Sequence, residues 1–364
     1  MDAHNPLSSV NPTTRRILSH AAPPTSPFPL VTRRTVPDVS SRMNRRQFLE
    51  TVAVSMVSGG TVLASPAASS SSKLPTRTFG RTGLNVPILG FGSGSRFLMY
   101  KDEDRALAAL SRAIDSGICY IDTAHAYGDG KSEERIGRIM PTRRKEVLLA
   151  TKIPGRTAEQ GRREIELSLK RLQTDHLDVL HIHSLRGAED LAAIEAPGGV
   201  LEALYQAREQ KITRAIGITC HADPAALRTA LERHDFDCTQ MALNAGLAKM
   251  TESMKAIPAA HDSFEQLALP VANRKKMGII AMKVFGQEHL LGAAPVEKLL
   301  AYALSLPVSL ASVGMPQLDH IERNAAFART FKPMSARQRH QLQQSITDSH
   351  KLALHGFFAN HEDV

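Results

Sequence analysis

From residue 73 onward, short apolar runs alternate with segments in which apolar residues recur at helical spacing. Leu107, Leu110 and Ile114, for example, lie three or four positions apart and would line one face of a helix. Short β-rich runs that alternate with amphipathic helices are typical of parallel strands joined by helical crossovers. The eight apolar runs cover residues 88–91, 119–121, 147–150, 177–182, 215–218, 239–243, 279–284 and 308–313.

Eight such units in about 290 residues favour a closed (β/α)8 TIM barrel of the α/β class, because barrels typically take about 250 residues. The alternative is an open dinucleotide-binding sheet, which needs a GxGxxG sequence after a strand. Residues 90–94 (GFGSG) lack the third glycine at that spacing. The pattern therefore predicts one barrel domain over residues 73–331, followed by a C-terminal helix and tail over residues 332–364.

Residues 1–42 precede this pattern and are rich in proline, serine, threonine and arginine, without a sustained apolar period. This composition predicts a disordered segment, or an N-terminal extension upstream of a true start at Met43. In either case the segment is not expected to belong to the barrel.

Residues 43–68 have the features of a twin-arginine signal peptide. Arg45 and Arg46 precede Phe48-Leu49, a weakly apolar stretch follows, and small residues surround Ala67. The segment predicts export to the periplasm through the twin-arginine machinery, with cleavage near Ala67 or Ala68. Its apolar stretch is too short for stable membrane insertion, which takes about 20 apolar residues. A disordered basic tail is the alternative, and it would leave the protein in the cytoplasm.

The net charge of +9 first suggests a nucleic-acid partner. Part of that charge lies in the leader, and the remainder of the chain has no basic stripe with interleaved aromatic residues, so a nucleic-acid partner is not expected. Cys119, Cys220 and Cys238 form no CxxC pair, which argues against a disulfide framework and against a cysteine zinc site. No metal is expected.

Polar residues with catalytic chemistry follow three consecutive apolar runs. Asp122 ends the second run, Lys152 follows the third and His183 follows the fourth, while Tyr127 lies five residues beyond Asp122. In a barrel of parallel strands, the chemistry lies where the strands end and the loops begin. Neighbouring strands are about 4.8 Å apart, so Asp122 and Lys152 are predicted to pair directly.

These residue types together indicate a proton donor. An ammonium near a phenol stabilises the phenolate and lowers the tyrosine pKa. We expect Asp122 to hold Lys152 charged and oriented, and Tyr127 to give a proton to a carbonyl oxygen as a hydride reaches the carbon. His183 would hydrogen-bond the same oxygen. His181, which shares the parity of His183 one layer deeper, is predicted to be a core residue or a residue that supports the site residues from behind.

Several sequence stretches resemble the aldo-keto reductases. They are residues 79–84 (FGRTGL), 89–92 (LGFG), 122–128 (DTAHAYG), 132–134 (SEE), 150–152 (ATK) and 168–172 (SLKRL), together with Asp178 and His183. The likeness runs from about residue 73 to residue 327. It implies an NAD(P)(H)-dependent oxidoreductase that interconverts aldehydes or ketones and alcohols. It also places the family's catalytic tetrad on Asp122, Tyr127, Lys152 and His183.

The resemblance further implies a nicotinamide cofactor across the later strand ends. The residues it assigns to cofactor binding are Gly92, Ser93, Asp122, Thr219, Cys220, Gln240, Met282, Lys283, Gly314, His320 and Asn324. Thr219-Cys220 replaces the family's usual Ser-Asn, Met282 its usual stacking tyrosine, and Lys283 a common serine. NADP(H) is favoured over NAD(H) by family habit. NAD(H) stays open because a histidine such as His320 is a weaker phosphate partner than arginine.

Two further hypotheses accompany the reductase. The first is a non-catalytic or weakly catalytic NADP(H)-binding sensor or partner subunit, as some family members accompany ion channels. The second is an exported enzyme that keeps its cofactor bound and recycles hydride between two substrates. The segment 245–262 is rich in methionine and alanine and predicts an apolar wall for a pocket that takes a small carbonyl or alcohol substrate.

Overall fold

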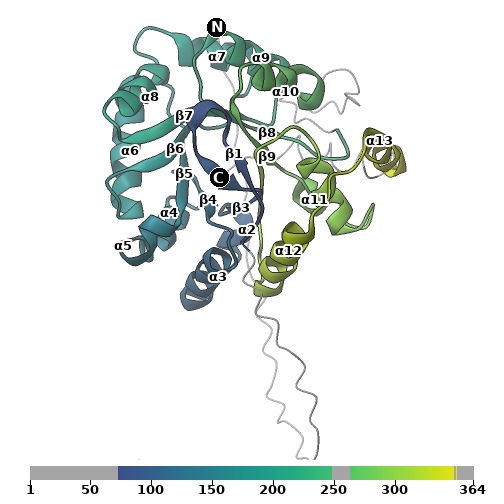
Figure 1. The fold of residues 1–364 in the computed structure, drawn as a ribbon. Coiled ribbons are helices and arrows are strands. Elements are labelled where there is room, and N and C mark those ends of the chain that lie inside the picture. The colour runs from purple at the N-terminus through teal and green to yellow at the C-terminus, as the bar shows by residue number, and fades with distance from the viewer. Residues whose placement is uncertain (1–72, 248–262, 348–349, 351–364) are drawn as a thin grey trace, which may run out of the picture. The chain divides into compact units, whose positions relative to one another are not determined.

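The computed structural model describes residues 73–247, 263–347 and 350, and the eight parallel strands within them close into a barrel. The strand order around the barrel is β10-β3-β4-β5-β6-β7-β8-β9, and Figure 1 shows the helices surrounding it. The predicted (β/α)8 barrel is confirmed, and the open-sheet alternative is wrong because β10 pairs with β3. The predicted leader, the export signal, most of the segment 245–262 and the end of the C-terminal tail lie outside the described residues.

Each barrel strand begins within two residues of a predicted apolar run. The strands are β3 Leu89–Gly92, β4 Tyr120–Asp122, β5 Leu148–Ile153, β6 Leu177–Ile182, β7 Thr213–Cys220, β8 Cys238–Ala242, β9 Gly278–Met282 and β10 Leu310–Val313. β5 continues beyond its apolar run because Lys152 pairs in register with His181 of β6. Lys152 therefore lies inside a strand and not in the loop after it.

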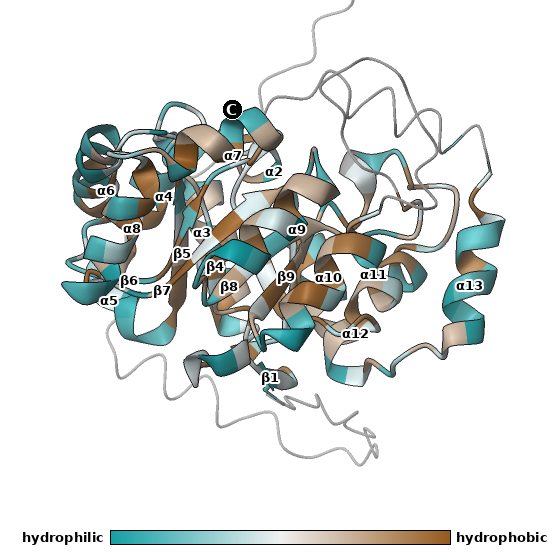
Figure 2. Ribbon diagram, turned by 90° about the horizontal axis from the view of Figure 1, so that it is seen from above, coloured by the Kyte–Doolittle hydropathy of each residue, from teal (hydrophilic) through white to brown (hydrophobic). Residues whose placement is uncertain are grey.

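Helices connect the strands and cover the outside of the barrel. The longer ones are α3 Glu103–Asp115, α4 Lys131–Gly137, α6 Ala158–Leu172, α7 Ala188–Glu195, α8 Val200–Glu209, α9 Pro224–Arg233, α10 Phe264–Arg274, α11 Val296–Leu304, α12 Leu318–Thr330 and α13 Ala336–Ser345. Short helices are α2 Ser95–Leu98, α5 Met140–Arg143, η2 Arg144–Glu146 and η3 Gly286–Glu288. Figure 2 shows hydrophobic residues on the strands and both hydrophilic and hydrophobic residues on the surrounding helices. None of the described helices has the length and apolar character needed to span a membrane.

Local sequence signals mark the ends of two helices. The Asp223 side chain accepts hydrogen bonds from the backbone N–H groups of Ala225 and Ala226, and Pro224 occupies the first turn of α9. Gly117, just beyond α3, has a φ of 89°, the left-handed conformation that commonly ends a helix. These residues mark where α9 begins and where α3 ends.

The inside of the barrel has an apolar layer and, above it, a polar one. β4 to β10 each contribute one inward side chain to the apolar layer: Tyr120, Ala150, Val179, Ala215, Cys238, Ile280 and Leu310. Because side chains alternate between the two faces of a strand, the residues two positions later also point inward. Those residues include Asp122, Lys152, His181, Gln240 and Ser312, so the polar groups gather toward the carboxyl ends of the strands.

A β-hairpin closes the other end of the barrel. β1 Thr76–Thr78 pairs antiparallel with β2 Asn85–Pro87, and η1 Gly80–Thr82 lies between them. Phe79 is fully buried, and its ring lies 6.1 Å from that of Tyr120 in the apolar layer. The hairpin is therefore a plug for the amino-terminal end of the barrel, which the apolar runs did not predict.

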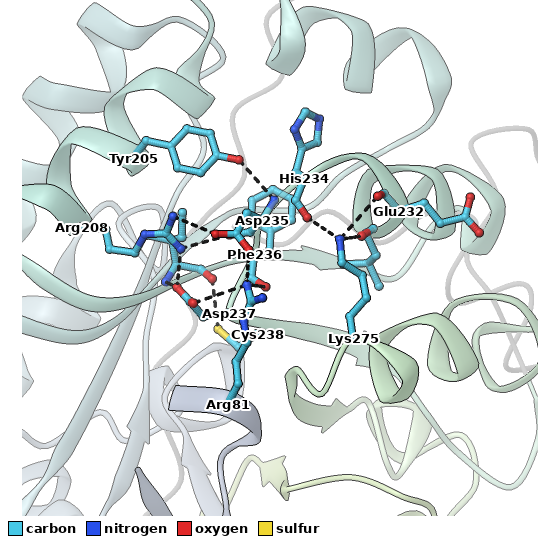
Figure 3. Close-up of polar contacts among 12 residues, drawn as sticks. Arg81, Tyr205, Arg208, Glu232, His234, Asp235, Phe236, Asp237, Cys238 and Lys275 are labelled. Atoms are coloured by element: carbon cyan, nitrogen blue, oxygen red, sulfur yellow. Dashed lines mark hydrogen bonds and ion pairs between the residues drawn. The ribbon is translucent and has the colours of Figure 1, made fainter. Parts of the chain in front are cut away.

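Charged side chains attach this hairpin to the start of β8 (Figure 3). Arg81 donates to the Phe236 carbonyl at 3.0 Å and pairs with Asp235. The hydrogen bond that Arg81 donates to the Asp235 carboxylate lowers the pKa of that carboxyl. Asp237 accepts from Arg208 at 2.9 Å and from the Ile216 backbone at 3.0 Å, which connects the same segment to α8 and β7.

We expect Phe79→Ala to destabilise the protein by about 3–5 kcal/mol, because the substitution leaves a cavity under the apolar layer. Urea unfolding followed by circular dichroism measures this loss, and Phe79→Leu should cost less. Since Phe79 lies at the end opposite the polar layer, the folded Phe79→Ala protein should keep the turnover of the parent. A loss of turnover without a loss of stability would contradict the assignment of Phe79 as a plug.

Candidate active site

The structure brings together the four residues that the strand ends predicted. Asp122 lies at the end of β4 and Lys152 in β5, and their side chains form a buried ion pair with Nζ–Oδ1 at 2.8 Å. Lys152 Nζ also donates to the Thr123 carbonyl at 2.7 Å and to the Tyr127 hydroxyl at 3.4 Å. The ring of His183, just past β6, meets the Tyr127 ring edge-on at 5.6 Å.

The four side chains differ in their access to solvent. Asp122, Lys152 and His183 are each less than 5% exposed, whereas Tyr127 is half-buried. Burial of a charge is costly unless a partner of opposite sign lies close, and Asp122 and Lys152 are partners in this sense. The phenol thus faces the solvent side of a fixed, buried ammonium.

The loop that carries Tyr127 is attached to α6 and β5. Arg171 of α6 donates to the backbone carbonyls of His125 at 3.1 Å and Asp129 at 3.2 Å. Glu133 is fully buried, accepts from the Thr151 hydroxyl at 2.7 Å and pairs with Arg171 at 3.5 Å. These contacts explain why the segments 132–134 and 168–172 accompany the tyrosine segment in the sequence.

A cavity of about 420 Å³ opens beside these residues, a size typical of ligand pockets. Its lining includes many of the residues predicted for the site: Gly92, Asp122, Tyr127, Gln240, Met282, Lys283, Gly314, His320 and Asn324. Ser93, Thr219 and Cys220 do not line it. Thr219 Oγ1 instead accepts from the Ser184 backbone at 2.8 Å, next to His183.

Cys220 lies on the outer side of β7. Its thiol donates to the Leu185 carbonyl at 3.1 Å within the core between strands and helices, and burial raises its pKa to about 12. Cys220 and Thr219 are adjacent in one strand, so their side chains must point to opposite faces. The structure therefore places only the backbone of Cys220 near the barrel mouth.

The cavity has features that fit a nicotinamide dinucleotide. Gln240 Nε2 donates to Asp122 Oδ2 at 2.8 Å, and this carboxylate fixes which way the amide points. Gln240 Oε1 is then a buried acceptor without a hydrogen-bond partner among the described residues, which suits the N–H of a primary amide such as the nicotinamide carboxamide. Lys283, His320 and Arg323 line the cavity as well and supply basic groups suited to phosphates.

Several lining residues escaped the sequence interpretation. Arg96 of α2 and Glu288 of η3 form an ion pair at 3.2 Å at the rim of the cavity, and no local pattern distinguishes them from ordinary surface charges. Ser312 also lines the cavity. The signal for Ser312 was a polar residue inside an apolar run, at the same strand parity as the inward-facing Leu310.

Comparisons with known proteins agree with this geometry. The family model for the aldo/keto reductase family matches residues 88–295. L-galactose dehydrogenase of Arabidopsis thaliana is 35% identical over 161 residues, covering 40% of this chain and 49% of that protein. D-threo-aldose 1-dehydrogenase of Pseudomonas sp is 30% identical over 247 residues, covering 58% of this chain and 70% of that protein.

A solved structure extends the comparison. The aldo/keto reductase of Klebsiella pneumoniae in complex with NADP and acetate is 25% identical, with a TM-score of 0.57, covering 74% of this chain and 95% of that one. The chain spans about half the length of the first curated relatives that it matches.

His181 is a buried titratable group beneath the site. It is fully buried, and neither ring nitrogen has a hydrogen-bond partner among the described residues. The ring fills space left by Gly217, where a Cβ would lie only 2.6 Å from His181 Nδ1. Burial, with a smaller effect of the Lys152 ammonium, lowers the pKa of His181 to about 3. His181 is thus neutral in the folded protein, in line with its prediction as a core residue.

This shift predicts a loss of stability in acid. A histidine whose pKa is lower in the folded than in the unfolded protein contributes fully above the unfolded value of about 6.5, and this contribution is lost as the pH falls toward 3. Between pH 8 and pH 5 we expect His181 to account for about 2 kcal/mol of lost unfolding free energy. Urea unfolding at the two pH values measures the difference in unfolding free energy. This difference should become smaller in His181→Leu and should remain in His176→Gln, which replaces an exposed histidine. An equal loss in His181→Leu and the parent would contradict the shift.

Proposed function

Because the chain belongs to the aldo/keto reductase family, we propose that it is an NADP(H)-dependent oxidoreductase that interconverts aldehydes or ketones and alcohols, with Tyr127 as general acid and base. One observation carries the proposal: Lys152 Nζ lies 2.8 Å from Asp122 Oδ1 and 3.4 Å from the Tyr127 hydroxyl. A buried ammonium that is ion-paired with a carboxylate lies beside a half-buried phenol. This arrangement can hold a proton on the phenol and help to move it.

The direction of proton movement follows from the charges. In reduction, Tyr127 gives its proton to the carbonyl oxygen, and the phenolate that remains is stabilised by the ammonium of Lys152. In oxidation the phenolate takes the hydroxyl proton of the alcohol, and the same ammonium favours the starting state. His183, beside the tyrosine ring, is placed to hydrogen-bond the substrate oxygen and orient it.

The cofactor supplies the hydride when it is bound. In this proposal Gln240 would accept a hydrogen bond from the carboxamide, Met282 would lie toward the ring, and Lys283, His320 and Asn324 would hold the more distant part of the dinucleotide. NADP(H) is favoured over NAD(H), since four basic residues line the cavity (Arg96, Lys283, His320 and Arg323) and the similar Klebsiella protein was solved with NADP. The two dehydrogenases named above support the oxidation of sugar-like alcohols as one direction to test.

Tyr127→Phe should lower turnover at least a hundredfold while leaving the affinity for NADPH unchanged, because proton donation typically contributes about 10²–10⁴-fold. The assay follows NADPH absorbance with a panel of aldehydes, ketones and sugars, using the chain from residue 73. Tyr120→Phe is a matched control, since Tyr120 belongs to β4, the strand that precedes the Tyr127 loop, but lies in the apolar layer. The turnover of this variant should match that of the parent.

The same assay separates the enzyme from the binding-only alternative. A protein that binds NADPH tightly and turns over none of the panel would favour a sensor or partner subunit. Turnover that survives Tyr127→Phe would remove the role proposed for the tyrosine.

We also propose export through the twin-arginine pathway, which the sequence of residues 43–68 supports. Replacement of Arg45 and Arg46 by lysine should keep the protein in the cytoplasmic fraction at its full length. The mature parent should start near residue 67 or 68 by mass spectrometry. A parent that stays cytoplasmic and uncleaved would contradict export.

A further inference from the structure

The two oxygens of the Asp122 carboxylate have different partners, a charged one on Oδ1 and two uncharged hydrogen-bond donors on Oδ2. While Oδ1 faces Lys152, Oδ2 accepts hydrogen bonds from Gln240 Nε2 at 2.8 Å and from Ser312 Oγ at 3.0 Å. All of these groups are buried, with Ser312 7% exposed and Asp122 4% exposed. The ion pair is therefore connected to β8 and β10 as well as to its own strand β4.

A glycine makes the contact with Ser312 possible. β3 lies between β10 and β4, and Gly92 of β3 is in register with Asp122. A Cβ at Gly92 would lie 3.2 Å from the Val313 backbone carbon and 3.3 Å from Ser312 Oγ, so a side chain here would crowd the serine hydroxyl. Glycine at this position leaves room for that hydroxyl.

The hydrogen bonds from Gln240 and Ser312 restrict the rotation of the Asp122 carboxylate about its χ2 torsion. The carboxylate of an aspartate rotates in a broad, roughly two-fold well, so contacts must set its plane. Two donors on Oδ2 hold that plane, which in turn holds Oδ1 against Lys152. The lysine then keeps its distance from the Tyr127 hydroxyl, because the Thr123 carbonyl fixes a second of its protons.

We propose that Ser312 is a positioning residue of this active site, which sets the Asp122 carboxylate and through it the ammonium that serves Tyr127. The inference rests on the proposed oxidoreductase function. Ser312 does not exchange a proton in it. Loss of the Ser312 hydroxyl lets the Asp122 carboxylate rotate. The chemical step then becomes slower, while cofactor binding is not weakened.

Ser309 offers a matched control just before β10. It is 6% exposed, and its hydroxyl donates to the Thr78 carbonyl at 3.2 Å at the plugged end of the barrel. Ser309→Ala thus removes a buried serine hydroxyl of the same kind, close in the sequence, and should lower the melting temperature about as much as Ser312→Ala. Its turnover should stay that of the parent.

The experiment compares kcat and the NADPH dissociation constant for the parent, Ser312→Ala, Ser312→Thr and Ser309→Ala, with the aldehyde of the panel that the parent reduces fastest. We expect Ser312→Ala to lower kcat about tenfold with less than a twofold change in NADPH affinity. Ser312→Thr, which keeps the hydroxyl, should stay within threefold of the parent. When Asp122→Asn is already present, adding Ser312→Ala should lower kcat by less than a further twofold, because the two residues act as one unit.

Equal turnover in Ser312→Ala and Ser309→Ala would overturn the inference, and so would a full tenfold loss in the Asp122→Asn background. Both results require an active parent and would leave the proposed function intact. A parent that reduces nothing in the panel would instead overturn the proposed function, and the role of Ser312 with it.

Discussion

The ion pair between Asp122 and Lys152 is the constraint on which the rest of the site depends. Two charges buried inside a barrel are stable only when they are paired and their remaining hydrogen-bonding capacity is used. The Thr123 carbonyl, the Gln240 amide and the Ser312 hydroxyl meet this need. These contacts leave one N–H group of the Lys152 ammonium pointing at the Tyr127 hydroxyl. The contacts that stabilise the charge therefore also orient it toward the phenol.

The barrel separates stability from chemistry along its axis. At the amino-terminal end the hairpin and the apolar layer form a core that excludes water, with Phe79 against Tyr120. Two residues further along the strands most inward side chains become polar, and Asp122, Gln240 and Ser312 line the cavity. His181 lies at this boundary and is neutral, because a second positive charge beside Lys152 would be buried without a partner.

The eight strands and the candidate catalytic residues could be predicted because both leave local traces. An apolar run followed at once by an ionisable residue marks the end of a buried strand, and Asp122 and His183 show this signal. The hairpin left no such trace. β1 and β2 have three residues each, β1 is largely exposed, and β2 ends in a proline. Its function as a plug depends on a barrel that must already be closed.

The sequence by itself determined the fold class, the order of the strands along the chain and the types of residue at their ends, since periodicity is a property of neighbouring positions. Only the tertiary structure decided which distant side chains form hydrogen bonds with one another. Ser312 and Asp122 are 190 positions apart, and their hydrogen bond requires the closure of β10 onto β3 together with the empty position at Gly92. The rim pair of Arg96 and Glu288 depends on the same closure, because strand register and not local pattern sets distances across a barrel.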